Sequence, residues 1–318
     1  MRQQTLAGTG FERHRKMTRR ERFLQEMDRI VPWQRLVDVV APYYPTGERG
    51  RPPVGLERML RVYCLGHWYN LSDPALEEAL YDIEAMRRFV GIDLGREAAP
   101  DETTICKFRH LLEDNDLGAA LFAEINAHLA GQGVQVSGGT IVDATIIDAP
   151  SSTKNQRGER DPQMHQTKKG NQWYFGMKGH FGVDSSTKLI HTVVVTAANT
   201  ADGSVVGDLL HGEETRVWGD KAYDGQREAI AEAAPDAQNH THDKGHRHRP
   251  LTEHQEAANR YKSSVRSKVE HPIGTIKRVF GFRKVRYRGI AKNANRLFVA
   301  SALANLFNVR RRLLMAGA

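Results

Sequence analysis

Three acidic residues that lie far apart in this 318-residue sequence could together hold divalent metal ions. Asp143 interrupts the apolar run IVDATIIDAP, which is typical of a buried strand, and an ionised carboxylate there is costly unless another charge compensates it. Asp220 ends a second strand-like run, TRVWGD, and Glu270 lies in the helical segment RSKVEHPIGTIKR. If the three carboxylates converge, they form an all-oxygen site that suits Mg²⁺ or Mn²⁺. Two such ions about 4 Å apart can activate an attacking oxygen and stabilise a leaving oxygen in phosphoryl transfer.

The segment around Glu270 places two cations on the same predicted helix face. Arg266 precedes Glu270 by about one turn, and Lys277 follows it by nearly two full turns. One face would then present a metal-binding carboxylate between two groups that can contact DNA phosphates. Pro272 lies inside this segment, which we expect to be helical from about 252 to 277, and a helix break there would weaken the argument.

The elements that must position these acids fall into two parts. Residues 1–132 are predicted to form an all-helical N-terminal DNA-binding domain. Its basic run at 12–22, ERHRKMTRRER, is either a DNA-contacting arm or a solvated tail. From residue 133 to 318 the order strand, hairpin, helix, strand, helix predicts a catalytic domain with a mixed sheet and helices on its faces. The predicted fold class is therefore α/β.

A long polar segment interrupts the second part. Residues 149–173 are expected to form a loop in which basic residues, among them Lys168 and Lys169, outnumber acidic ones. Long loops inside compact domains are usually functional or disordered. We expect this loop to lie over bound DNA.

The run IKRVFGFRKVRYRGIAK at 276–292 contains seven basic residues and no acid, with Phe280, Phe282 and Tyr287 between them. This pattern favours phosphate contacts combined with base stacking, and the alternative places the aromatic rings in the core with the charges solvated. The residues predicted to bind DNA are Arg266, Lys277, Arg278, Arg283, Lys284, Arg286, Arg288, Lys168 and Lys169.

The composition restricts the class of protein further. The formal net charge of +8 favours a polyanionic partner such as nucleic acid. Two cysteines exclude a disulfide framework and a cysteine-rich zinc site. Neither a bilayer-spanning stretch nor an apolar signal segment is present, so we expect a cytoplasmic protein without a membrane partner. The histidines of QNHTHDKGHRHRP, at 240, 242, 246 and 248, could bind zinc, but the segment is more typical of a solvated loop.

The sequence resembles the insertion sequence 5 family of bacterial DDE transposases, from about residue 20 to 310. The runs that carry the resemblance include HWYNLSDPALEEALYDI, TTICKFRHLLE, VDATIIDAPSSTKN, RDPQMHQTKKGNQWYFGMKGH, TAAN, LLHGEE and VEHPIGTIKRVFGF. In the related signature a Tyr precedes the Arg at 266 by three positions, whereas this sequence has Ser263 there and Tyr261 two residues earlier.

The resemblance implies a ribonuclease-H-like core with helices on both faces and a catalytic triad of Asp143, Asp220 and Glu270. It implies Mg²⁺ as the cofactor, with two ions and Mn²⁺ as a substitute, and double-stranded DNA as the partner. The implied reaction cleaves the element at its terminal inverted repeats and joins the ends to target DNA. We expect a homodimer or larger assembly, because two ends must be brought together.

Two other functions remain open at this stage. The protein could be a catalytically silent, transposase-derived DNA-binding protein, although the complete triad argues against that. It could also be a nuclease of the same fold that cuts DNA without joining it.

Overall fold

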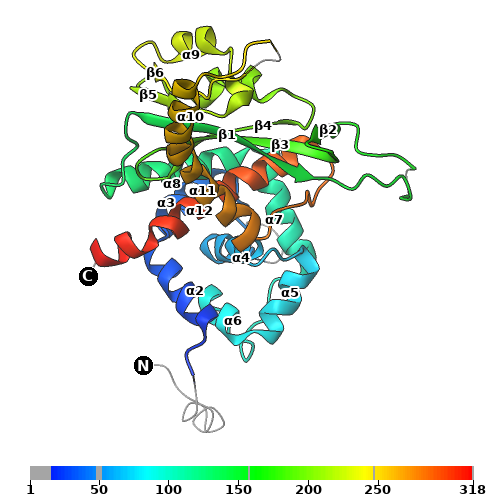
Figure 1. The fold of residues 1–318 in the computed structure, drawn as a ribbon. Coiled ribbons are helices and arrows are strands. Elements are labelled where there is room, and N and C mark those ends of the chain that lie inside the picture. Colours follow the sequence, from blue (N-terminus) through cyan, green and yellow to red (C-terminus); the bar gives the residue numbers. More distant parts are fainter. Residues whose placement is uncertain (1–15, 48–51, 157, 246–247, 317–318) are drawn as a thin grey trace.

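The computed structural model describes residues 16–47, 52–156, 158–245 and 248–316 (Figure 1). The N-terminal part of these ranges is helical, as predicted. Its helices are α2 (Arg19–Ile30), α3 (Trp33–Val40), α4 (Leu56–Trp68), α5 (Asp73–Asp82), α6 (Glu84–Val90), α7 (Glu102–Asp114) and α8 (Leu117–Gly131).

Local sequence explains where several of these helices begin and end. The Thr18 hydroxyl accepts a hydrogen bond from the Glu21 amide at the start of α2, and the Asp101 carboxylate accepts one from the Thr104 amide at the start of α7. Gly91 ends α6 with a φ of 78°, a left-handed conformation that glycine adopts without a steric penalty. The basic run at 12–22 is described from residue 16 onwards, and Arg19, Arg20 and Arg22 lie in α2.

The second part contains a six-stranded mixed sheet. Its order is β2-β3-β1-β5-β6, and β4 pairs with β3. Strand β1 is antiparallel to β3 and parallel to β5, so the prediction of a mixed sheet is confirmed. The strands are β1 (Gly139–Asp148), β2 (His165–Lys169), β3 (Gln172–Asp184), β4 (Ile190–Ala197), β5 (Arg216–Trp218) and β6 (Gln238–Asn239).

One prediction about the sheet was wrong. Residues 165–169, expected to belong to the polar loop at 149–173, form strand β2 and pair with the first residues of β3. None of the five is buried, so β2 lacks the alternation of apolar and polar residues that identifies a half-buried strand. The loop therefore ends at residue 164, and it projects from the body between β1 and β2 in Figure 1.

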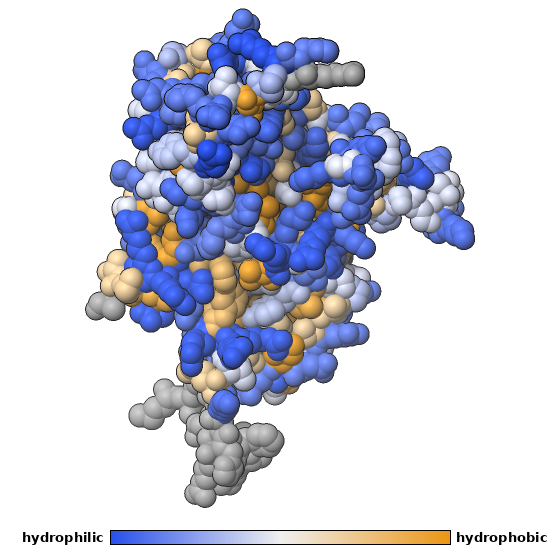
Figure 2. All heavy atoms as spheres, viewed as in Figure 1, coloured by the Kyte–Doolittle hydropathy of each residue, from blue (hydrophilic) through white to orange (hydrophobic). Residues whose placement is uncertain are grey.

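Apolar residues fill both faces of the sheet. The larger core contains Ile141 and joins the sheet to the N-terminal helices and to α12 (Ile290–Ala316). The smaller core contains Val142, Val217 and Tyr223 and is covered by α9 (Arg227–Ala233) and by 3₁₀ turns at 202–205 and 207–209. Adjacent residues of β1 thus enter opposite cores, as the two-residue period of a strand requires. Hydrophilic side chains cover most of the face in Figure 2, with apolar ones in patches between them.

Helix α12 connects the two halves of the chain. It packs on α8 and α2 from the N-terminal part and on β4 of the sheet. The Gly118 amide donates a 2.7 Å hydrogen bond to Oδ1 of Asn295, and a Cβ atom on Gly118 would collide with that side chain. Helix α12, from the C-terminal part of the chain, therefore packs among the N-terminal helices. The division into two domains at residue 132 remains a prediction. No helix in the described ranges is both long and apolar enough to cross a bilayer.

The segment around Glu270 is a series of helical turns rather than one regular α-helix. Helix α10 (Glu253–Arg266) leads through a 3₁₀ turn (Ser267–Val269) into α11 (Glu270–Gly274), which continues as a π-helical turn (Thr275–Val279). Pro272 has no amide hydrogen to bond the carbonyl four residues earlier, and the chain departs from α-geometry on both sides of it. The helical direction continues, so Arg266, Glu270 and Lys277 stay on one side.

Candidate active site

The sheet register brings Asp143 and Asp220 next to each other. Ile141 on β1 is paired with Trp218 on the parallel strand β5. Each aspartate follows its paired residue by two positions, and neighbouring strands lie about 4.8 Å apart. The two carboxylates therefore leave adjacent strands at the same level.

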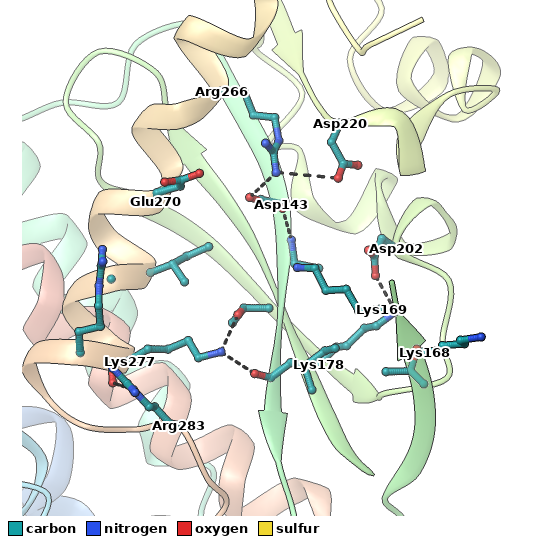
Figure 3. A pocket seen from close by; sticks show the side chains of 17 residues that line it. Asp143, Lys168, Lys169, Lys178, Asp202, Asp220, Arg266, Glu270, Lys277 and Arg283 are labelled. Carbon is teal, nitrogen blue, oxygen red and sulfur yellow. Dashed lines mark hydrogen bonds and ion pairs between the residues drawn. The ribbon is translucent and has the colours of Figure 1, made fainter. Parts of the chain in front are cut away.

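A single cation contacts both carboxylates. Nη2 of Arg266 donates a 3.2 Å hydrogen bond to Oδ2 of Asp143 and lies 3.8 Å from Oδ2 of Asp220 (Figure 3). The other oxygen of each aspartate is held by backbone, since Oδ1 of Asp143 accepts from the Ala144 amide and Oδ1 of Asp220 from the Ala222 amide. The backbone thus orients both side chains, and their remaining oxygens point towards one positive charge.

The electrostatics of Asp143 show why that charge is needed. Burial raises the pKa of Asp143, and the neighbouring negative charge of Asp220 raises it further. The Arg266 guanidinium and the Ala144 amide act in the opposite direction but do not cancel the effect of burial, so the net pKa shift is upward. A more highly charged cation would favour the ionised form more strongly than Arg266 does.

The helical segment supplies the opposite wall. Glu270 lies one turn after Arg266, about 6 Å along the helix axis, and borders the same cavity as both aspartates. Glu270 is exposed, and no described side chain forms a hydrogen bond or ion pair with it. Nζ of Lys277 donates to Oγ1 of Thr145 at 3.1 Å and to the Ile146 carbonyl at 2.8 Å, which ties the end of this segment to β1.

These residues line an open cavity of about 610 Å³. Strand β5 pairs only with residues 139–141 of β1, so beyond residue 141 the cavity lies along an edge of β1 that is not covered by β5. Among the described residues, the charged side chains at the cavity comprise seven cations and four acids. They are Lys168, Lys169, Lys178, Arg266, Lys277, Arg278, Arg283, Asp143, Asp202, Asp220 and Glu270 (Figure 3).

Six of the nine residues predicted to bind DNA border this cavity, and three do not. Lys284 is exposed outside it. The Arg286 guanidinium donates to the Asn70 carbonyl and side chain, and Arg288 donates to the Arg160 carbonyl. The contacts of Arg286 and Arg288 hold the segment after β1 and the end of α4 against the C-terminal part of the chain.

Two of the three interleaved aromatic residues, Phe280 and Phe282, lie in the core, whereas the base-stacking interpretation required them on the surface. Phe280 and Phe282 are each 2% exposed and belong to the large core, and the Tyr287 ring packs under the Arg109 guanidinium at 4.2 Å. The alternative interpretation is therefore correct for Phe280 and Phe282, and Tyr287 is half-buried. Burying a phenylalanine side chain stabilises the folded protein by about 1.5–3 kcal/mol. A ring kept exposed for DNA would forgo this stabilisation in the absence of DNA.

Sequence reasoning missed a second charged group at the cavity. Nζ of Lys178 on β3 forms a 2.8 Å ion pair with Asp202, and Nδ1 of His180 lies 4.0 Å from the same carboxylate. Burial lowers the pKa of His180 to about 4. The signal in the sequence was the charge of Lys178, two residues before His180 in a largely apolar strand, but the strand pattern alone did not connect it to Asp202.

Two further predicted features lie near the site. Ser263, at the position of the family tyrosine, contacts Nε2 of His242 through its hydroxyl at 3.3 Å, while Tyr261 is 64% exposed. His240 stacks on Trp218 with ring centroids 5.4 Å apart. His240 and His242 thus pack against the protein, whereas His246 lies outside the described residues.

The paired aspartates have the chemistry that a hard divalent cation prefers. Asp143 and Asp220 already share one positive charge, and Nε of Arg266 is buried without a hydrogen-bond partner in the described structure. All donors are carboxylate oxygens, which Mg²⁺ and Mn²⁺ prefer. Within the described ranges no three His, Cys, Asp or Glu side chains converge closely enough to hold a metal ion. The two aspartates are therefore the carboxylates that lie together, and Glu270 lies apart from them on the wall of the same cavity.

Comparison with known proteins decides the family. Residues 135–306, more than half of the chain, match the family described as the transposase DDE domain. The chain belongs to the DDE transposase family. Residues 12–111 of this transposase also match a second family, described as a transposase domain (DUF772). No solved structure matches it significantly.

The family assignment makes the chain a DNA transposase, an enzyme of the nucleotidyl-transferring, DNA-cleaving kind. It also accounts for the positive charge of the cavity, because the substrate of such an enzyme is DNA. The mixed sheet and its covering helices agree with the ribonuclease-H-like core of the family.

Proposed function

We propose that this transposase is of the insertion sequence 5 type, binds the terminal inverted repeats of its element, cleaves the element ends and joins them to target DNA. The observation that carries the proposal is the pairing of Asp143 and Asp220 around one cation, with Glu270 on the facing wall of a basic cavity. Such a site combines donors for metal with contacts for phosphate.

In this proposal Asp143, Asp220 and Glu270 hold two Mg²⁺ or Mn²⁺ ions. When bound, such ions lower the pKa of an attacking water and stabilise the leaving oxygen of a phosphodiester. The hydrogen bonds from the Ala144 and Ala222 amides keep the two aspartates oriented, so that little reorganisation is needed on binding. Glu270 approaches from α11 and completes the donor set.

The cations of the cavity would hold the substrate. Arg266 lies between the aspartates and is the group best placed to transfer its contacts to a DNA phosphate when metal binds. Lys277, Arg278 and Arg283 follow along the helical segment and the turn after it. Lys169 faces them from β2, and Lys168 beside it also borders the cavity, with its side chain pointing outwards in Figure 3. A double-stranded DNA backbone between the two walls would therefore meet positive charge on both sides.

Joining two element ends in one reaction requires two active sites, so we propose that a homodimer or larger assembly forms on DNA. The buried connection between α12 and the N-terminal helices would make each copy rigid enough to hold one end.

The test uses a labelled duplex that carries the terminal repeat flanking the gene, a target plasmid and Mg²⁺. Wild-type protein should cleave the duplex at the repeat and join it to the plasmid. Asp143→Asn, Asp220→Asn and Glu270→Gln should each bind the duplex but neither cleave nor join, while Asp224→Asn, a nearby aspartate outside the cavity, should behave as wild type.

Pre-cleaved ends separate the remaining alternatives. Joined products support the proposal, cleavage without joining identifies a nuclease, and binding without either reaction identifies a silent DNA-binding protein. Wild-type cleavage by any one of the three acid variants would remove that residue from the proposed site.

A further inference from the structure

Trp173 stands apart from the other tryptophans of the chain. All four lie in the described ranges, and Trp33, Trp68 and Trp218 are at most 8% exposed, whereas Trp173 is 65% exposed. Leaving a large aromatic ring in water forgoes the free energy of burying it. An exposed tryptophan therefore suggests a partner for its ring.

The ring is presented by the hairpin of β2 and β3. Trp173 is paired with Lys168 across the two strands, and the turn between them contains Gly170 with a φ of 62°. Residues directly opposite each other in an antiparallel pair share one face of the sheet. Nζ of Lys168 accordingly lies 5.9 Å from the Trp173 ring centroid, within the range of a cation–π contact.

The same face continues the pattern towards the body of the protein. Phe175 is two residues further along β3, and the Arg160 guanidinium lies 5.5 Å from its ring centroid. Phe175 is half-buried and packs against the large core, so Trp173 is the ring of this hairpin that is free to stack. An exposed ring beside cations suits a nucleic-acid strand, because a base can stack on the ring and the phosphates pair with positive charge.

A basic path joins this hairpin to the carboxylates. Lys168 and Lys169 border the cavity that contains Asp143. Asp143 is paired with Phe181, and Trp173 lies eight residues before Phe181 on the same strand, which places it about 27 Å from the acids at the rise of an antiparallel strand. A DNA strand leaving the cavity along β3 would reach Trp173 after passing the two lysines.

We propose that Trp173 and Lys168 form a stacking site for an unpaired base of a single-stranded DNA segment that extends from the cleaved end. This inference rests on the proposed function. Single-stranded DNA is favoured over duplex because a paired base has both faces covered by its neighbours, whereas an unpaired base can stack on the indole. The hairpin offers ring faces and lysines rather than a set of hydrogen-bond donors aimed at base edges.

The exposure of Trp173 makes the test direct. Full-length Asp143→Asn protein is titrated in EDTA with a short oligothymidylate, with a blunt duplex of the terminal repeat, and with the same duplex carrying a single-stranded extension. Tryptophan emission is followed, since the other three tryptophans are buried and respond little to a surface ligand. The oligothymidylate and the extended duplex should quench the emission, and the blunt duplex should not.

Variants assign the signal. Trp173→Ala should weaken binding of the oligothymidylate by about 5- to 150-fold and abolish the quenching, because one stacked base contributes that much affinity. Trp173→Phe should recover part of the affinity, and Tyr43→Ala, an exposed aromatic outside the cavity, should bind as the parent protein does. The substitution removes an exposed ring, so the thermal unfolding of Trp173→Ala should match that of the parent.

Three results would overturn the inference. One is an unchanged affinity of Trp173→Ala for the oligothymidylate, and another is equal quenching by blunt duplex. The third is a change of oligomeric mass in Trp173→Ala without DNA, measured by sedimentation, which would make the hairpin a contact between copies of the chain. A Trp173→Ala variant that retains Asp143 is tested separately for cleavage of the terminal repeat. This measures the proposed function, so the stacking site and the proposed function can fail independently.

Discussion

Removing the charge of Arg266 should destabilise the metal-free protein and make it depend on divalent metal. In Arg266→Met the two carboxylates lose the cation that lies 3.2 Å from one and 3.8 Å from the other. Breaking a fully buried ion pair costs about 3–5 kcal/mol. The side chains of Arg266 and Asp220 are 25% and 37% exposed, so solvent screening should reduce the loss in unfolding free energy to about 1–2 kcal/mol.

Divalent metal should reverse this loss. In the wild type a metal ion has to displace Arg266 from Asp143 and Asp220, whereas in Arg266→Met it does not. A tenfold tighter metal site adds about 1.4 kcal/mol of stability once the metal is well above its dissociation constant. Mg²⁺ or Ca²⁺ should therefore stabilise the variant more than the wild type and bring the two close together.

The assay is urea unfolding monitored by circular dichroism, in EDTA and in about 10 mM Mg²⁺, a concentration chosen to exceed a weak dissociation constant. Arg278→Met is the matched control, because it removes an arginine from the same cavity without an ion pair to either aspartate. Equal stabilisation of Arg266→Met and wild type by Mg²⁺ would refute the idea that Arg266 and the metal compete for one place. The contacts of Arg266 with Asp143 and Asp220 would then be ion pairs that do not compete with metal.

Three further predictions concern other parts of the molecule. Burial lowers the pKa of His180 to about 4, so the unfolding free energy should fall by up to about 3 kcal/mol as the pH falls from about 6.5 to 4. His180→Gln should remove that part of the fall, as measured by urea unfolding at each pH. Lys277→Met should weaken duplex binding and make the slope of log affinity against log salt shallower by about one, measured by fluorescence anisotropy. Gly118→Ala should lower the unfolding free energy by about 1–3 kcal/mol, because its Cβ would force Asn295 and α12 away from α8, and a normal urea midpoint would contradict this.

Local sequence patterns were sufficient to predict the helices and strands that bury one face in the core. The apolar run around Asp143 formed β1, and the helical spacing of Arg266, Glu270 and Lys277 placed all three at one cavity. The pairing of β1 with β5, which makes Asp143 and Asp220 neighbours, is not encoded in either run alone, because strand register depends on contacts distant in the sequence.

The errors have physical causes of the same kind. Strand β2 is an edge strand without buried residues, so it had no apolar period to detect. Phe280 and Phe282 stand between cations in the sequence, but the turn after the π-helical segment directs their rings into the core. The contact of Arg266 with two carboxylates could not be predicted from its helix, because Asp143 in β1 and Asp220 just after β5 are more than forty residues away in the sequence.

The most direct test of the central claim is to map the residues that surround a bound metal ion. Ferrous iron is supplied in place of Mg²⁺, with ascorbate and peroxide, so that radicals formed at the ion cut the backbone next to its ligands, and the fragments are identified by mass spectrometry. The account predicts cuts close to Asp143, Asp220 and Glu270 together, all suppressed by excess Mg²⁺ and by Asp143→Asn. Cuts near the two aspartates but none near Glu270, or cuts that Mg²⁺ does not suppress, would contradict a single metal centre built from these three acids.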